Sequence, residues 1–175
     1  HATIDTLLDL RARHDLTPGA ITGVEVGVNA VVPTVLQHAD PVTALERKFS
    51  MQYCAAAALV DGAVTMASFE DGPVQNRAVR DLMPRITMTV DDTLPHELSQ
   101  QAWTRVRLRL ADGRVLEAPA RGAQGHPDQP LSLDTLRAKF LGCAEPVMPR
   151  DEADAIAEQI LHLEDIPDIR ALTSR

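Results

Sequence analysis

The residues best suited to chemistry lie in a short polar stretch in front of an alanine-rich run. Lys48, Ser50 and Tyr53 precede residues 55–59, which are good helix formers, and Gly62 follows where a left-handed helix cap is expected. The start of a helix attracts anions because its dipole and its free N–H groups are positive there. A lysine, a hydroxyl and a phenol at this position could therefore bind the carboxylates of a small acid.

Each of these residues also has an ordinary structural explanation. A tyrosine in a helix usually packs in the core with its hydroxyl bonded, and a lysine such as Lys48 is usually a surface charge. In one straight helix, Lys48 and Tyr53 would point about 140° apart. For both side chains to reach one ligand, Lys48 must lie at or before the start of the helix.

Two histidines could supply a base or a further contact. His1 stands four residues before Asp5, so the two side chains can share one face of a helix. His126 lies in a loop rich in glycine and proline at residues 120–130, a composition that fits a mobile connection or a site loop. A neutral imidazole can accept a proton from the carbon next to a carboxylate. The alternatives are a frayed terminal histidine and a solvent-exposed loop histidine.

These segments resemble the MmgE/PrpD family, and the resemblance extends along almost the whole chain. It rests on six segments in this order: His1-Ala2-Thr3-Ile4-Asp5, Lys48-Phe49-Ser50-x-x-Tyr53, Asp61-Gly62, Gly125-His126, Pro130-Leu131-Ser132 and Lys139-Phe140. Members of the family include 2-methylcitrate dehydratase, cis-aconitate decarboxylase and iminodisuccinate epimerase. Their shared chemistry acts on small polycarboxylates and requires no metal.

The resemblance implies a role for each candidate residue. His1 and Tyr53 are expected to be catalytic, and Lys48, Ser50 and His126 are expected to bind the substrate, with neither metal nor cofactor. Some members of the family have histidine at the position of Lys48. The family places further site residues in an upstream helical domain and commonly forms dimers. We therefore expect a small polycarboxylate, that domain and a second copy as partners, and little or no activity from this chain alone.

The resulting functional prediction is a dehydratase or lyase of the 2-methylcitrate dehydratase type, an enzyme of propionate catabolism. It would act by removing a proton next to a carboxylate. His1 can accept that proton, Lys48 can hold the negative oxygens, and Tyr53 can donate a proton to the leaving hydroxyl. A racemase or epimerase and a decarboxylase of the same family are the alternatives. A non-catalytic α+β module for binding or assembly, or a subunit that has kept the fold and lost the chemistry, is the alternative from another class.

The composition of the chain argues against several other classes of protein. The 175 residues carry 25 acidic against 17 basic side chains, a net charge of −8, and only 3% are aromatic, which argues against a general nucleic-acid-binding protein. No apolar run approaches the roughly 18 residues of a membrane span, and the start shows no signal-peptide pattern. Cys54 and Cys143 lack metal-ligand spacing, so we interpret them as reduced, buried thiols in a cytoplasmic protein.

The elements that must position these residues follow from hydrophobic periodicity and turn signals. Helices are expected at residues 1–14, from Thr43 or from Ser50 into the alanine run, and at 75–83, 133–141 and 150–163. Strands are expected at 21–30 and 86–90, with residues 31–36 continuing the first, and residues 103–119 form a hairpin around Asp112-Gly113. Three arginines alternate with apolar residues in this hairpin, and we interpret their face as a solvated one balanced by nearby acids.

This order of elements predicts an α+β fold, with an antiparallel sheet covered by helices on one face. The resemblance implies the division into domains. Residues 20–121 would be a small α+β domain, and residues 1–19 and 122–175 would be helices and a loop of an all-helical domain that lies largely outside this chain. Because the first residues already have a helical pattern, we also expect further chain before His1.

Overall fold

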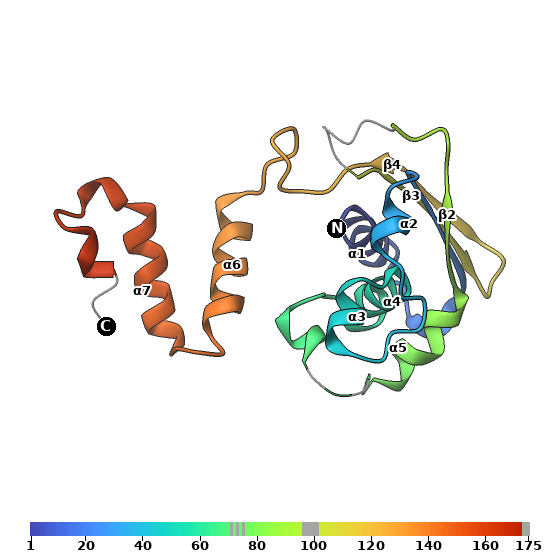
Figure 1. Ribbon diagram of the computed structural model, residues 1–175, viewed down its shortest axis with the longest axis horizontal. Helices are drawn as coiled ribbons and strands as arrows, with labels where there is room; N and C mark the ends of the chain where they lie inside the picture. Colours follow the sequence, from blue (N-terminus) through green and yellow to red (C-terminus); the bar gives the residue numbers. More distant parts are fainter. Residues whose placement is uncertain (71, 73, 75, 96–101, 173–175) are drawn as a thin grey trace. The chain divides into compact units, whose positions relative to one another are not determined.

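The computed structural model describes residues 1–70, 72, 74, 76–95 and 102–172. These residues divide into two compact units, His1–Pro130 and Leu131–Arg175, and each unit has its own packed interior (Figure 1). The two units are considered separately below. The candidate residues of the sequence all lie in the first unit.

The first unit is an α+β fold, as the sequence predicts. The strands are β1 (Ile21–Val28), β2 (Ile86–Val90), β3 (Thr104–Leu110) and β4 (Val115–Arg121), in the sheet order β2-β1-β3-β4. The α-helices are α1 (Ala2–His14), α2 (Val32–Val35), α3 (Ala44–Lys48), α4 (Met51–Asp61) and α5 (Arg77–Leu82), with 3-10 turns at Pro18–Ala20, Met66–Phe69 and Met83–Arg85.

The sheet is mixed, so the expectation of an antiparallel sheet is corrected in one pairing. β1 pairs with β3 and β3 with β4 in antiparallel fashion, but β1 and β2 are parallel. Parallel strands need a long crossover connection, and here the chain passes through α2 to α5 before it reaches β2. The β3–β4 hairpin forms where the sequence places it.

The two faces of the sheet differ as the alternation in β3 predicts. Thr104, Val106, Leu108 and Leu110 are buried, and α1 and α4 pack on that face (Figure 1). The three arginines of β3 point to the other face and pair there with acids: Arg105 with Asp91 at 2.6 Å, Arg107 with Glu117 at 3.0 Å, and Arg109 with Glu25. The arginine face is therefore an ion-paired, solvated surface.

The helix α4 lies at the centre of the core. Its residues 55–59, four alanines and Leu59, are fully buried. Alanine side chains are short, so α1, α5 and β2 can approach the α4 backbone closely. Ser50 caps the start of α4, because its Oγ accepts a hydrogen bond from the Tyr53 N–H at 3.1 Å. Gly62 ends the helix with a φ of 73°, the left-handed cap expected from the sequence.

The chain before α4 contains two helix starts rather than one. Thr43 caps α3 through a reciprocal capping box with Glu46, and Ser50 then caps α4. Both starts that the sequence left open are thus used. The expectation that residues 31–36 extend the first strand is wrong, because Val32–Val35 form the short helix α2 with Pro33 in its first turn, where proline costs no hydrogen bond.

The helix α1 packs within the first unit. Leu7 and Leu10 belong to the same core as α4 and the sheet, and the Thr3 and Thr104 hydroxyls are hydrogen-bonded at 3.0 Å. The compact unit therefore runs from His1 to Pro130, which is wider than the range 20–121 given to the α+β domain above. That α1 also belongs to a larger helical domain stays a prediction.

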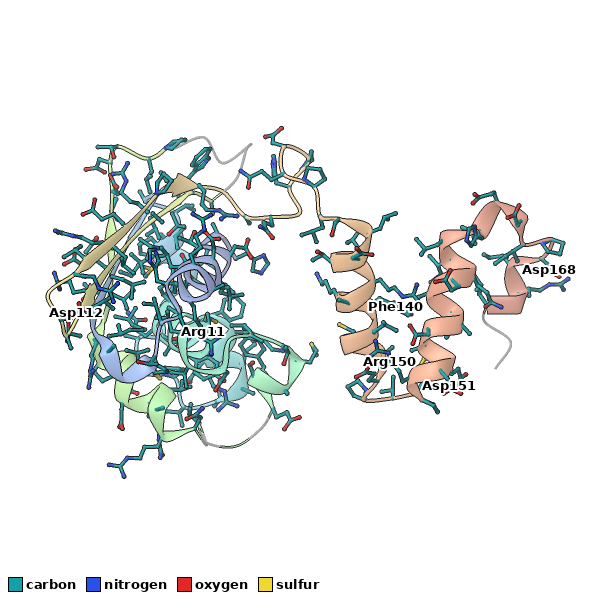
Figure 2. The ribbon with its side chains drawn as sticks, turned by 180° about the vertical axis from the view of Figure 1, so that it is seen from behind. Arg11, Asp112, Phe140, Arg150, Asp151 and Asp168 are labelled. Carbon is teal, nitrogen blue, oxygen red and sulfur yellow. The ribbon has the colours of Figure 1, made fainter. Side chains whose placement is uncertain are left out.

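The second unit consists of α6 (Leu133–Ala144) and α7 (Arg150–Leu161), followed by 3-10 turns at Leu163–Asp165 and Ile169–Leu172. Ser132 caps α6, as its sequence predicts, by accepting from the Thr135 N–H at 3.2 Å. A small core of Leu141, Ala144 and Ala153 joins the helices, with Phe140 packed against it (Figure 2). Cys143 is exposed and Cys54 is half-buried, so the expectation that both cysteines are buried is wrong for Cys143 and holds only in part for Cys54; both are free thiols.

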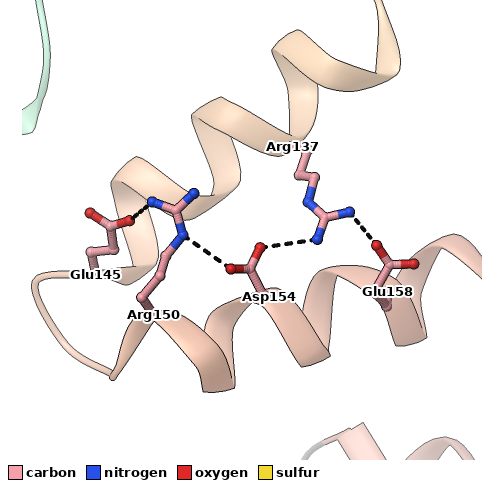
Figure 3. Close-up of polar contacts among 5 residues, drawn as sticks. All are labelled: Arg137, Glu145, Arg150, Asp154 and Glu158. Atoms are coloured by element: carbon pink, nitrogen blue, oxygen red, sulfur yellow. Dashed lines mark hydrogen bonds and ion pairs between the residues drawn. The ribbon is translucent and has the colours of Figure 1, made fainter.

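An ion-pair network links α6 to α7 across this small core (Figure 3). Asp154 lies 3.0 Å from Arg137 and 3.1 Å from Arg150, while Glu158 pairs with Arg137 and Glu145 with Arg150. The Arg137 guanidinium, followed by that of Arg150, holds the pKa of the Asp154 carboxyl below its ordinary value. Neither these helices nor any other in the described ranges has the length and apolar character that a bilayer span requires.

Candidate functional site

Three of the predicted site residues line one hollow of about 320 Å³, here called the His1 hollow. His1 reaches it from the start of α1, Lys48 from the end of α3, and Ser50 from the cap of α4. The remaining lining comes from the same elements and from the end of α2: Thr3, Ile4, Val35, Leu36, Phe49, Met51, Cys54 and Ala55. His1 thus meets Lys48 and Ser50 in one hollow, although at least 47 positions separate it from them in the sequence.

The starts of two helices face the His1 hollow. The first turn of α1 and the first turn of α4 both contribute lining residues. The far end of α1 is bonded to the far end of α4, since Arg11 Nε donates to the Leu59 carbonyl at 3.0 Å. The helices therefore run side by side in the same direction, and the positive ends of both dipoles point to the hollow. With Lys48 at its rim, this surface suits an anionic ligand.

Tyr53 lies elsewhere, in a second hollow of about 360 Å³, here called the Tyr53 hollow. Tyr53 is one helical position from Cys54, so its side chain leaves α4 on a neighbouring face. The polar lining of this hollow includes Arg47, Asp61, Ser68 and Asn76. The structure therefore brings His1, Lys48 and Ser50 together but places the phenol at a different opening.

The Tyr53 side chain is almost fully buried, with only 6% of its surface exposed. Its hydroxyl donates a hydrogen bond to the Ser68 carbonyl oxygen, and its ring lies against Phe69 with the centroids 6.1 Å apart. Burial raises the pKa of the phenol above its ordinary value, against the opposing effect of the nearby Arg47 charge. Tyr53 is therefore a protonated phenol at neutral pH, as a proton donor must be.

The opposite wall of the Tyr53 hollow joins α4 to α5. The side-chain amide of Asn76 donates to the Asp61 carboxylate at 2.6 Å, and its oxygen accepts from the Ala78 N–H at 3.0 Å, which caps α5. This arrangement fixes the Asp61 carboxylate in the lining of the Tyr53 hollow, to which Arg47 also belongs. The hollow thus has charged groups of both signs, unlike the His1 hollow.

His126 lines neither hollow. Its Nδ1 lies 3.2 Å from the Asp128 carboxylate, and its carbonyl accepts from the Gln129 N–H at 2.8 Å, so the imidazole belongs to a local turn. The loop is nonetheless attached near the catalytic candidate, because the Gln124 N–H donates to the Asp5 carboxylate at 2.8 Å, one turn from His1. Its substrate-binding role stays a prediction.

Two residues at these hollows were missed by sequence reasoning. Arg47 is 3% exposed, and its guanidinium carbon lies 5.6 Å from the centre of the Tyr53 ring. Cys54 lines the His1 hollow, and burial raises the pKa of its thiol to about 11. The sequence does offer Thr43 as a helix start, and this start is that of the short helix α3. No local signal shows that the arginine in it turns inward.

Within the described ranges, no group of three or more histidine, cysteine, aspartate or glutamate side chains is arranged to hold a metal ion.

Comparison with known proteins adds a relationship to this geometry. Residues 1–165 match the model of the family described as MmgE/PrpD C-terminal domain. Over 128 residues the chain is 30% identical to cis-aconitate decarboxylase of Mus musculus, which covers 73% of the chain and 26% of that protein. Over 135 residues it is 29% identical to cis-aconitate decarboxylase of Homo sapiens, covering 77% and 28%. The chain thus spans about a quarter of the length of these curated relatives.

Proposed function

The chain belongs to the MmgE/PrpD family, and we propose that it forms the C-terminal part of a lyase that acts on a small di- or tricarboxylate by removing a proton next to a carboxylate. The observation that carries the proposal is the His1 hollow, where a histidine, a lysine and the starts of two helices face one space. An acidic protein needs such a local concentration of positive groups to bind a polyanion.

The first step of this reaction is proton abstraction. A neutral His1 imidazole would accept the proton from the substrate carbon. The negative charge would move onto the adjacent carboxylate as an enolate, where Lys48 and the N–H groups at the start of α4 stabilise it. The residues that carry these groups line or border the same hollow. The Lys48 ammonium, which lies 5.8 Å from the centre of the Phe69 ring, would turn from that ring towards the substrate.

The second step requires an acid, and in this proposal the acid is Tyr53. Its phenol is protonated at neutral pH, but its single proton is engaged with the Ser68 carbonyl. Donation to a leaving hydroxyl therefore requires the Tyr53 hydroxyl to exchange that carbonyl for the substrate. The first step would thus use groups of one hollow, whereas the second needs a rearrangement at the Tyr53 hollow.

Dehydration of a substrate of the 2-methylcitrate type is the specific reaction predicted from the sequence. Decarboxylation is the second candidate, because both relatives named above are cis-aconitate decarboxylases. Both reactions develop negative charge next to a carboxylate, so both make the same demand on Lys48. They differ at His1, which would accept a proton in dehydration, whereas decarboxylation breaks the bond from carbon to CO2 and needs a donor that gives a proton to that carbon. The roles of Ser50 and His126 in substrate binding, the absence of a cofactor and a cytoplasmic location belong to the same proposal.

The proposed partners include an upstream helical domain and a second copy of the chain. The second unit supports the first of these, because several of its apolar side chains are exposed: Leu133, Leu136, Val147, Ile160, Leu161, Leu163 and Ile169. A surface of this kind on a small helical pair favours packing against further helices. If such helices carry the remaining site residues, this chain alone would have little activity.

The test uses the full-length gene product in D₂O with 2-methylcitrate, citrate, cis-aconitate and iminodisuccinate, followed by proton NMR. New alkene signals indicate dehydration, loss of a carboxyl indicates decarboxylation, and deuterium uptake without net conversion indicates epimerisation. A folded protein that neither converts nor deuterates any of the four would argue against the lyase and favour the non-catalytic binding module. Binding of the substrate panel without turnover would point to the same module.

A further inference from the structure

Arg47 is a buried cation in a short helix that is otherwise largely exposed. It is 3% exposed, whereas its neighbour Glu46 is half-buried and its neighbour Lys48 is exposed. Burying a charge is unfavourable unless hydrogen bonds replace its hydration. The Arg47 guanidinium obtains them from two backbone carbonyl groups in the segment after α4: Nη1 donates to Gly72 at 2.6 Å, and Nη2 donates to Glu70.

The segment held by Arg47 is also the one that holds Tyr53. The 3-10 turn Met66–Phe69 precedes these carbonyl groups, and the Ser68 carbonyl within it accepts the hydrogen bond from the Tyr53 hydroxyl. On its other side, the Arg47 guanidinium lies over the Tyr53 ring. Arg47 thus contacts Tyr53 directly and, through residues 70 and 72, fixes the acceptor of its proton.

We propose that Arg47 is the positioning residue for Tyr53: its two-branched hydrogen bonding to Glu70 and Gly72 holds the turn with Ser68 against α4 and so sets the orientation of the phenol. The inference rests on the proposed function, because positioning matters for catalysis only if Tyr53 acts on the substrate. The planar guanidinium is suited to this role, since it donates along two directions at once and also stacks on an aromatic ring. A lysine can supply the charge but not the fork, which is the planar group that donates hydrogen bonds along two fixed directions.

The geometry can be tested without any turnover, because Tyr53 is the sole tyrosine of the chain. N-acetylimidazole acetylates accessible phenols as well as amines, so the loss of phenol absorbance on acetylation, rather than the total acetyl uptake, reports on this one side chain. Two variants separate the two properties of the arginine. Arg47→Lys keeps a positive charge and loses the fork, and Arg47→Met keeps a chain of similar length and loses both.

We expect both variants to increase the rate of Tyr53 acetylation by about tenfold or more, because the lost charge-assisted hydrogen bonds contribute roughly that factor to a local opening equilibrium. Arg77→Met, at an exposed arginine paired with Asp81 at 3.5 Å, should leave the rate unchanged. Val106→Ala in the buried face of β3 controls for general loss of stability, and circular dichroism confirms that each variant is folded.

Three outcomes would overturn the proposal. A rate in Arg47→Lys equal to that of the parent chain would show that charge alone suffices and that the fork has no positioning role. Unchanged rates in both variants, or an equal increase in Val106→Ala, would make Arg47 an ordinary core residue. In the full-length enzyme, the expected signature is a fall in kcat with little change in KM. If that enzyme has no activity at all, the proposed function fails, while the acetylation result still decides the role of Arg47.

Discussion

Arg11 and Gly62 are in close contact at the end of α4: a Cβ atom added to Gly62 would lie 2.7 Å from the Arg11 Nη1 atom. Arg11 uses its Nε to bond the Leu59 carbonyl one turn earlier, so the same side chain both satisfies the end of α4 and fills the space beside the glycine. Because His1 directly precedes α1 and Ser50 directly precedes α4, this contact at the far ends helps to set the distance between the two starts.

Gly62→Ala should therefore destabilise the fold by more than the positive φ of residue 62 alone would cause. An alanine at a φ of 73° costs about 1 to 2 kcal/mol, and displacement of the Arg11 guanidinium adds to that cost. Gly113→Ala is the matched control, because Gly113 has a φ of 87° and open space around its Cβ position. Urea unfolding of both variants checks the expectation. Equal losses of unfolding free energy would mean that Arg11 gives way freely.

His1→Asn and Lys48→Met should separate the two parts of the proposed first step. Loss of the base should lower kcat of the full-length enzyme by about 10²- to 10⁴-fold. Loss of the ammonium should mainly raise KM, by roughly tenfold or more, because it removes a charge-assisted contact to a substrate carboxylate. Lys139→Met, at the other lysine of the chain, is the control. Steady-state kinetics measure all three, and full activity of His1→Asn would exclude His1 as the base.

Tyr53→Phe should remove turnover and leave the fold intact. The substitution keeps the ring between Arg47 and Phe69 and removes only the hydroxyl bonded to Ser68, at a cost of about 1 kcal/mol in the free energy of unfolding. The full-length enzyme should lose about 10² or more in kcat, as expected for a missing general acid. Kinetics and urea unfolding are measured on the same variant. Retained turnover would assign the phenol to structure alone.

Cys54 should make the first unit sensitive to alkaline pH. Its thiol has a folded-state pKa of about 11 against an ordinary value of 9.0, so burial favours the protonated form. The corresponding stability is fully present below pH 9 and is lost as the pH rises from 9 towards 11, by about 2 to 3 kcal/mol at most. Tyr53, whose pKa is also raised, contributes in the same direction at higher pH.

The measurement is urea unfolding at intervals between pH 8 and 11. Cys54→Ala should show a smaller loss of unfolding free energy over this range than the parent chain, and Cys143→Ala, at the exposed cysteine, should show the same loss as the parent. Identical pH profiles for all three proteins would show that the Cys54 thiol ionises as freely in the folded chain as in the unfolded one.

Asp154→Asn should loosen the second unit, because Asp154 bridges Arg137 and Arg150 (Figure 3). Since its folded-state pKa is lowered, the stabilisation is present above the ordinary value of 3.8 and is lost as the pH falls through the folded pKa. Amide hydrogen exchange in α6 and α7 should become faster in the variant, and added salt should reduce the difference. Asp165→Asn, an equal change of charge outside these helices, should leave the exchange unchanged.

The sequence is sufficient for the local parts of this fold. Ser50 and Gly62 mark the ends of α4, and Asp112-Gly113 marks the β3–β4 turn, because caps and tight turns depend on a few neighbouring residues. The parallel pairing of β1 and β2 has no such signal, since it depends on a crossover through four helices. The short helix α2 was missed because Pro33 reads equally well as an interruption of a strand.

The same distinction between local sequence signals and long-range packing applies to the candidate site. Family resemblance names His1, Lys48 and Tyr53, but which of them share a hollow depends on how α1, α3 and α4 pack. Arg47 was missed for the same reason: in sequence it is one of three consecutive charged residues, and only contacts with the segment at residues 70–72 show that it is buried.

The sheet order has a consequence for folding during synthesis on the ribosome. β1 lies at the centre of the sheet, yet its two neighbours are made only when synthesis has reached residues 86–90 and 104–110. Until then β1 and the alanine face of α4 lack most of the surface that buries them, and such delayed, long-range pairing slows folding and exposes chains to aggregation. The strands of the β3–β4 hairpin are close in sequence, so they can pair early. The central strand β1 can then pair with β3 of this hairpin.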